Sequence, residues 1–169
     1  MLFRSFLRSP QSFKQKRRSN EDLEIVRKKA EDNNIKILIH ANYMLNFCNP
    51  TLHGKACKIL VEDLEDSIKL NAIGVVVHMG HNTKKLKITN NEAIDNYVNG
   101  IKNVLKNSPK NSTIVFETGA GQGNETCTEI IELGNLRKMF TEDEQKRIKF
   151  CIDTCHVFSA GYNLGDKKI

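Results

Sequence analysis

Short runs of apolar, mostly β-branched residues alternate with longer amphipathic segments along this chain. Runs of this length and composition are typical of buried β-strands. The pattern predicts four clear strands and a weaker one at the N-terminus: 35–40, 73–78, 113–117, 148–153 and the weaker 2–7.

The segments between these runs have the apolar spacing of α-helices. The first helix is predicted to begin at Ser19, which with Asp22 resembles a capping box, and to carry Leu23, Val26 and Ala30 on one face. Three further helical regions are predicted: about 55–71, the apolar stripe from Ile94 to Leu105, and about 126–147, broken by Gly134. Apolar strands that alternate with helices predict a parallel sheet covered by helices, so the fold class is α/β.

The four clear strands each end in a residue that can bind a metal ion: His40, His78, Glu117 and Asp153. Successive members of this set are 38, 39 and 36 positions apart, which matches the roughly 30–40 residues of one βα unit of a (β/α)₈ barrel. In such a barrel the carboxyl ends of the strands converge on the face that carries active sites. A polar strand end facing solvent explains any single position better, whereas four in succession favour a site for Zn²⁺ or Mn²⁺.

The stretch CIDTCHVFSAGYN places two cysteines, a carboxylate and a histidine close together near the last predicted strand. Cys151 and Cys155 lack the second cysteine pair that structural zinc sites use, so we expect both to be small packing residues. His156 lies just past the strand, in a predicted loop on the active-site face, and we expect it to act beside Asp153.

The charge of the chain is concentrated at its N-terminus. The formal net charge is +6, and residues 1–18 hold six Arg and Lys residues and no acid. Such a segment fits a phosphate-binding arm, a transit peptide or a nuclear-import patch, and composition does not rank these. The five scattered cysteines favour reduced thiols in an intracellular compartment. The longest apolar runs have strand length, so no membrane segment is predicted.

Four motifs resemble those of the endonuclease IV family of apurinic/apyrimidinic (AP) endonucleases, in the family's order. They are IHANYMLNFCNP, VVVHMG, IVFETGAGQG and CIDTCHVFSAGY. The resemblance implies a (β/α)₈ TIM barrel of the xylose-isomerase-like type that binds up to three zinc ions, with Mn²⁺ as an alternative metal. It implies these ligands: His40, His78 and Glu117 for the first ion, Glu117 as the catalytic bridge to a second ion with Asp153, and His156 for the third.

The resemblance also implies the reaction and the partner. The expected activity is DNA repair by hydrolysis of the phosphodiester 5′ to an abasic site in double-stranded DNA, leaving a 3′-hydroxyl. Tyr43 matches the family's minor-groove tyrosine, and residues 8–14 align with a DNA-contacting loop. Arg8 and Lys14 are therefore expected to contact DNA, although the arginine that the family uses there has no fixed counterpart in RSPQSFKQ.

The chain departs from this family in its extent. Family members carry one strand before the equivalent of residue 2 and two after the CIDTCH motif, and the later ones supply a histidine, an Asp-x-His pair and a glutamate. We therefore expect about five of the eight βα units. Residues 1–18 are expected to form a basic segment of a weak strand and a loop, and 19–169 a partial barrel domain.

The sequence leads to further expectations about activity, assembly, location and alternative functions. The chain is expected to be a fragment with little activity alone, and a monomer unless a second chain completes the barrel. It is expected to be intracellular, in the nucleus or cytoplasm, with the mitochondrion also open. Two other functions stay open: a sugar isomerase or epimerase of the xylose-isomerase-like barrels, and a DNA- or metal-binding remnant that does not cut.

Overall fold

Five parallel strands form a single sheet in the computed structural model, which describes residues 1–13 and 16–165. Their order across the sheet is the order along the chain: β1 (Leu2–Phe6), β2 (Lys36–His40), β3 (Val75–His78), β4 (Ile114–Glu117) and β5 (Ile148–Cys151). Each strand pairs in parallel with the next, and β1 pairs with β2 over its full length. The predicted α/β class, with five βα units of a partial barrel, is confirmed.

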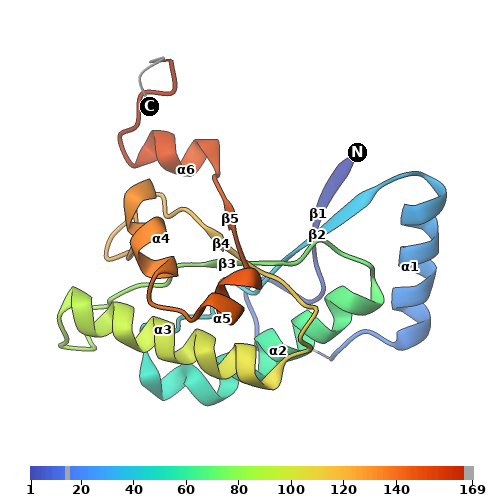
Figure 1. Cartoon of the computed structure of the whole chain (residues 1–169), viewed down its shortest axis with the longest axis horizontal. Coiled ribbons are helices and arrows are strands. Elements are labelled where there is room, and N and C mark those ends of the chain that lie inside the picture. The colour runs from blue at the N-terminus through green and yellow to red at the C-terminus, as the bar shows by residue number, and fades with distance from the viewer. Residues whose placement is uncertain (14–15, 166–169) are drawn as a thin grey trace.

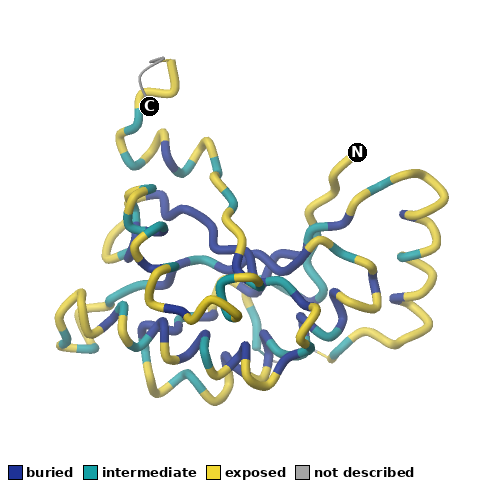
Figure 2. The backbone as a smooth tube through the Cα atoms, in the orientation of Figure 1, coloured by how far each residue is buried: buried dark blue, intermediate teal, exposed yellow. Residues whose placement is uncertain are grey.

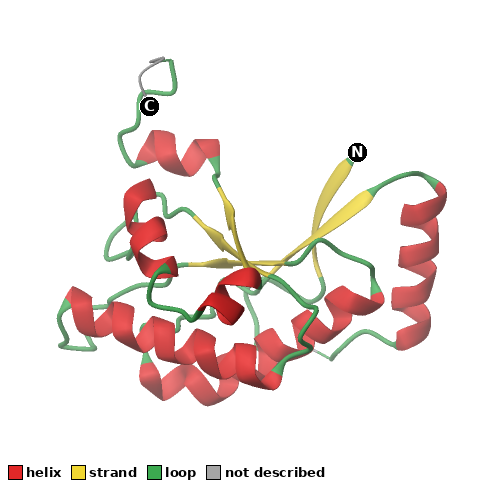
Figure 3. Ribbon diagram, in the orientation of Figure 1, coloured by secondary structure: helices red, strands yellow, loops and turns green. Residues whose placement is uncertain are grey.

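The helices cover one side of the curved sheet and leave the other side open, as Figures 1 and 3 show. In chain order they are α1 (Asn20–Asp32), the 3₁₀ turn η1 (Pro50–Leu52), α2 (His53–Lys69), α3 (Asn90–Asn107), α4 (Ile130–Arg137), α5 (Glu142–Lys146) and α6 (Thr154–Ser159). The open side corresponds to the inner face of a barrel. Helices α1 to α5 lie on the outer face, whereas α6 lies beyond the end of β5. The long helices α2 and α3 pack side by side beneath the centre of the sheet.

Alternation along each strand separates the core from the inner face. Ile39, Val77 and Phe116 belong to the buried core on the helix side, where they meet apolar residues of the helices. Their neighbours one residue along the strand point to the opposite face, since successive strand residues alternate. This places the last residues of β2, β3 and β4 together on the inner face. Figure 2 shows the buried backbone concentrated in these central strands.

Two helical predictions need correction in detail. Val26 shares the predicted face with Leu23 and Ala30, but it is exposed because it borders an open groove between β1 and α1. Gly134 does not break the fourth helical region; α4 runs through it, and the break lies between α4 and α5. A Cβ at Gly134 would meet nothing within 4 Å, and buried Leu133 and Leu136 anchor the helix on either side.

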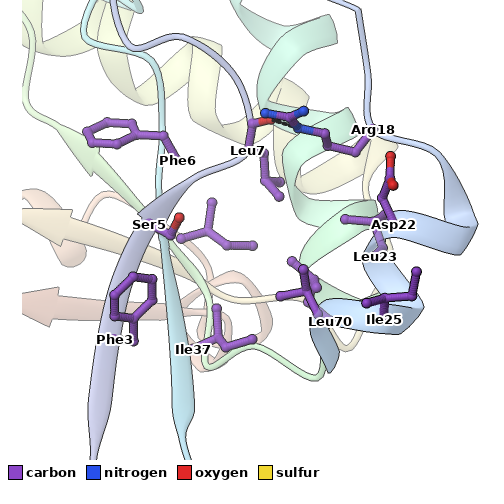
Figure 4. Close-up of a pocket in the computed structure, with 12 residues that line it drawn as sticks. Phe3, Ser5, Phe6, Leu7, Arg18, Asp22, Leu23, Ile25, Ile37 and Leu70 are labelled. Atoms are coloured by element: carbon purple, nitrogen blue, oxygen red, sulfur yellow. Dashed lines mark hydrogen bonds between the residues drawn. The ribbon is translucent and has the colours of Figure 1, made fainter. Parts of the chain in front are cut away.

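The groove between β1 and α1 is lined mostly by apolar residues (Figure 4). Phe3 and Ser5 of β1 line it together with Leu23, Ile25 and Val26 of α1. On the inner face, the Phe6 ring contacts the ring of His40, and Arg4 reaches Glu117.

Two basic residues of the N-terminal segment, Arg8 and Arg17, pair with acidic residues of α2. Arg17 binds Asp66 and Glu65, with its guanidinium Nη2 2.6 Å and 2.8 Å from their carboxylate oxygens. Arg8 lies against Glu62 and Asp63, and its side chain is only 7% exposed. Part of the excess charge that composition places in residues 1–18 is therefore paired within the fold.

Asp63 gives the fold a pH dependence that can be measured. Burial raises the pKa of Asp63 to about 7, although Arg8 lies 3.0 Å away and acts to lower it. Between about pH 4 and pH 7, the Asp63 carboxyl is therefore protonated in the folded protein and ionised in the unfolded chain. Because the folded state binds the extra proton, this group makes the unfolding free energy fall as the pH rises. As the pH is raised from about 5 to about 8, we expect the unfolding free energy of Asp63→Asn to rise by roughly 1–2 kcal/mol relative to that of the native chain. Urea unfolding at both pH values measures this.

The control for this prediction is Asp32→Asn, which changes an exposed carboxyl at the end of α1. Its difference from the native chain should be the same at both pH values. A constant difference for Asp63→Asn would contradict the expected burial effect.

Over the described residues, none of the helices combines the length and the apolar character needed to span a bilayer.

Candidate metal centre

Three polar side chains meet at the ends of adjacent strands on the inner face. His40, His78 and Glu117 are the last residues of β2, β3 and β4. Glu117 Oε2 lies 3.1 Å from His40 Nε2 and 3.0 Å from His78 Nε2, and the two imidazole nitrogens are 3.1 Å apart. The parallel pairing that sets His78 opposite Glu117 fixes this convergence.

The backbone sets the orientation of the His40 ring. His40 Nδ1 lies 2.7 Å from the carbonyl oxygen of Ala41. A carbonyl only accepts, so Nδ1 carries the hydrogen and, in the neutral ring, the Nε2 lone pair faces the centre of the cluster. The rings of Phe6, Tyr43 and His78 contact His40 with centroid distances of 4.9–5.0 Å, which restricts its rotation.

Glu117 is ionised in this setting. Its side chain is 1% exposed, and burial acts to raise its pKa. The hydrogen bonds and charges of His40 and His78 outweigh burial and hold the pKa of Glu117 well below its ordinary value. A buried carboxylate that stays ionised between two imidazoles offers an anionic oxygen to a cation.

A second group shares Glu117. Ligand atoms of Glu117, Asp153 and His156 lie within 4.8 Å of one another, as do those of His40, His78 and Glu117. Asp153 follows β5 and caps α6, since its Oδ1 accepts the backbone N–H groups of Cys155 and His156. His156 lies in the first turn of α6 rather than in the predicted loop, because Asp153 starts a helix there.

Thr118 holds both members of the second group in place. His156 Nδ1 lies 2.8 Å from the Thr118 carbonyl oxygen, so this nitrogen also donates and leaves Nε2 as the ligand atom. The backbone N–H of Asp153 donates to Thr118 Oγ1 at 3.2 Å. The sequence reasoning did not single out Thr118, and its position directly after the Glu117 strand end is the signal that could have done so.

These donors fit a divalent ion. In the first group, two imidazole nitrogens and a carboxylate oxygen point at one another at about hydrogen-bond distance, while the backbone holds the proton of His40 on the far nitrogen. A cation among these three atoms would take the place of any hydrogen shared between them and use one lone pair of each. Imidazole and carboxylate donors suit zinc, and a backbone bond behind a histidine ligand is the usual supporting arrangement.

Arg4 is a member of the cluster that sequence reasoning missed. Its Nη1 donates to Glu117 Oε1 at 2.8 Å, so it reaches from the first strand of the sheet to the fourth. A charged residue in the middle of a short strand, facing the same side as the strand-end ligands, was the available signal.

The two cysteines of the CIDTCH motif have different surroundings. Cys151 lies on the inner face at the end of β5, with Sγ 3.9 Å from Glu117 Oε1, and burial followed by the Glu117 charge raises its pKa. A thiol that resists ionisation is a poor metal ligand. Cys155 is exposed on α6, so the expectation that it packs inside the fold is wrong.

The three residues expected to contact DNA have different placements. Tyr43 is exposed at the rim of the cluster, and its ring lies 5.4 Å from that of His78. Arg8 is buried against Glu62 and Asp63, and this placement argues against a DNA contact for it. Lys14 lies outside the described residues. The loop before it does approach the site, since the Tyr43 N–H donates to the Pro10 carbonyl oxygen.

Comparison with known proteins agrees with this architecture. A family model described as xylose isomerase-like TIM barrel matches residues 3–169. A protein of Acanthamoeba polyphaga mimivirus, named as an endonuclease 4, is 38% identical over 168 residues, which are 96% of this chain and 54% of the relative. The chain thus spans about half the length of the curated relatives it matches.

Solved structures show the same fold. The crystal structure of endonuclease IV from Thermus thermophilus is similar with a TM-score of 0.77 and 26% identity, over 95% of this chain and 55% of that one. A D-tagatose 3-epimerase-like protein has a TM-score of 0.75 at 15% identity, over 92% of this chain and 57% of that one. The second likeness concerns the fold alone.

Proposed function

The chain belongs to the xylose isomerase-like TIM barrel family, and from this premise we propose that its strand ends hold a metal centre that cleaves the phosphodiester backbone of DNA at abasic sites. The observation that carries the proposal is the shared carboxylate of Glu117, which joins two groups of potential ligands on the inner face. Relatives named as endonuclease 4 support the choice of reaction.

The expected ligands divide into two sets around this carboxylate. His40 and His78 with Glu117 form the first, and Asp153 and His156 with Glu117 form the second. We assign zinc to them, since imidazole nitrogens make up much of the donor set. Zinc supplies a water of lowered pKa and neutralises charge on the phosphate.

The residues of the chain prepare the centre for this chemistry. The Ala41 and Thr118 carbonyl groups hold the protons of His40 and His156 on the nitrogens away from the centre. Glu117 stays ionised because the adjacent imidazoles outweigh its burial. Because water is the nucleophile in this reaction, no Ser or Cys nucleophile is required. The residues of the chain position the phosphodiester and the attacking water.

The partner that fits this site is duplex DNA with an abasic nucleotide. A nucleotide without a base leaves the stack at the lowest cost, and an exposed aromatic ring at the rim of the site can fill or cover the gap. Tyr43 is such a ring. A DNA substrate supports an intracellular location for the protein.

The test uses a duplex with one tetrahydrofuran abasic analogue and a matched intact duplex. The zinc-loaded chain should bind the abasic duplex at least about 10-fold more tightly, and any incision should fall 5′ to the analogue and stop with EDTA. Equal affinity for both duplexes together with no incision would refute the proposal.

Tyr43 provides a residue-level prediction for this site. Tyr43→Ala should weaken binding of the abasic duplex by about 10-fold, because stacking of a base on an aromatic ring typically contributes about 1–3 kcal/mol. Tyr43→Phe should retain most of the affinity, since the ring remains. Fluorescence anisotropy with labelled duplex measures both.

Met44→Ala is the matched control, because Met44 is the next residue and has the same exposed fraction of 44%. It should bind DNA like the native chain. Loss of affinity in Met44→Ala equal to that in Tyr43→Ala would remove any special role for the ring.

A second candidate function is sugar epimerisation, favoured by the structural likeness to a D-tagatose 3-epimerase-like protein. It is the weaker candidate, because that likeness rests on 15% identity against 38% for the endonuclease 4 relative. Conversion of a ketose by the metal-loaded chain, without preference for abasic DNA, would favour it.

A further inference from the structure

Arg4 is in direct contact with the residue that both groups of ligands share. Phe3 and Ser5 line the outer groove in Figure 4, so the Arg4 side chain lies on the opposite, inner face of β1. Its guanidinium donates to Glu117 Oε1 at 2.8 Å, and its side chain is 41% exposed whereas that of Glu117 is 1% exposed. A permanent cation therefore enters the centre from the solvent side.

The two oxygens of Glu117 have different partners. Oε2 faces the nitrogens of His40 and His78 at 3.1 Å and 3.0 Å. Oε1 faces Arg4, with the neutral thiol of Cys151 farther away at 3.9 Å. A metal ion on the histidine side can use Oε2 and leave the Arg4 bond in place.

An ion in the second group cannot bind Glu117 without disturbing the Arg4 contact. Asp153 has one oxygen engaged as the cap of α6, and an ion held by Asp153 and His156 also needs an oxygen of Glu117. That ion would compete with the guanidinium for the remaining oxygen and would be repelled by its charge. A guanidinium stays protonated at any ordinary pH, so the conflict is not removed by loss of a proton.

We propose that Arg4 makes the centre bind its two ions in sequence, with the second ion displacing Arg4 from Glu117. This inference rests on the metal function proposed above. The first ion binds His40, His78 and Glu117 without moving Arg4. The second binds Glu117, Asp153 and His156 only as the Arg4 side chain moves toward solvent, which its partial exposure permits.

The test is a calorimetric titration of the metal-free full chain with Zn²⁺. The native chain should show a tight first step and a much weaker second step. Arg4→Gln should tighten the second step by about 10- to 100-fold, the range that one charge-assisted hydrogen bond supports. The first step should tighten by a smaller factor than the second, because Oε2 and both histidines keep their places when Arg4 is replaced.

Three further variants sharpen the result. Arg27→Gln, which removes an arginine from an exposed pair with Glu31 on α1, should leave both steps unchanged. Arg4→Lys keeps the charge and should keep the second step weak. His156→Ala should remove the second step and retain the first, which assigns the two steps to the two groups.

Several outcomes would overturn the inference. A second step equally weak in Arg4→Gln and the native chain would do so, and so would a second step that Arg4→Lys tightens as much as Arg4→Gln. If Arg4→Gln melts below the control, Arg4→Met, which keeps an unbranched alkyl stem, takes its place. Failure of the native chain to bind a first ion would refute the proposed metal function and this inference with it, whereas a normal first step isolates the role of Arg4.

Discussion

Glu117→Gln is expected to remove high-affinity binding of a divalent ion while leaving the fold intact. Glutamine has the same shape, and its amide can donate to the imidazole nitrogens of His40 and His78. It cannot supply an anionic oxygen to either group of ligands. Because loss of a residue that merely supports a ligand costs roughly 10- to 100-fold in metal affinity, we expect a loss of more than about 100-fold for this shared ligand. Zinc titration against a competing chelator measures it.

The matched control for this substitution is Asp66→Asn. Asp66 is also a carboxylate with a side chain only 1% exposed, but it lies on α2 and pairs with Arg17. Its loss should lower stability and leave zinc affinity unchanged. If Glu117→Gln binds zinc within about 3-fold of the native chain, Glu117 is not a ligand and the proposed centre is wrong.

The fold could be predicted from the sequence because the apolar strand runs, the amphipathic helical segments and the spacing of the polar strand ends all indicate the same architecture. Apolar runs mark the strands, and parallel strands in chain order bring their last residues to one edge. That is why the sequence pattern alone could place His40, His78 and Glu117 together. Asp153 and His156 were also placed correctly near this edge, although α6 begins between them.

Other features depend on contacts that a linear pattern does not contain. Arg4 looks like one more basic residue of the N-terminal segment, and only the curvature of the sheet brings it to Glu117. Arg8 likewise looks available for phosphate, whereas the fold places it against acidic residues of α2. Composition predicts how many charged residues a segment carries, but tertiary packing determines which partner each charged side chain meets.

Arg147→Met is expected to cost about 2–4 kcal/mol of unfolding free energy. The Arg147 guanidinium donates to the carbonyl oxygens of Leu105, Pro109 and Ser112 and to the hydroxyl groups of Ser108 and Ser112, at 2.6–3.1 Å. It thereby ties the end of α3 and the turn before β4 to the start of β5. Methionine fills similar space and donates nothing, so these acceptors lose their partner. Urea unfolding followed by circular dichroism measures the change.

Lys146→Met is the control, because Lys146 is the preceding residue and its side chain is 74% exposed in a surface pair with Asp143. It should change stability by less than about 0.5 kcal/mol. Arg147→Lys should recover only part of the loss, since an ammonium group lacks the planar fork that reaches several acceptors at once. Equal effects of Arg147→Met and Lys146→Met would show that water replaces the guanidinium at no cost. A loss of stability in Arg147→Met alone would instead show that this one side chain holds the end of α3 to β5. It would thereby support the strand that leads into Asp153 and His156.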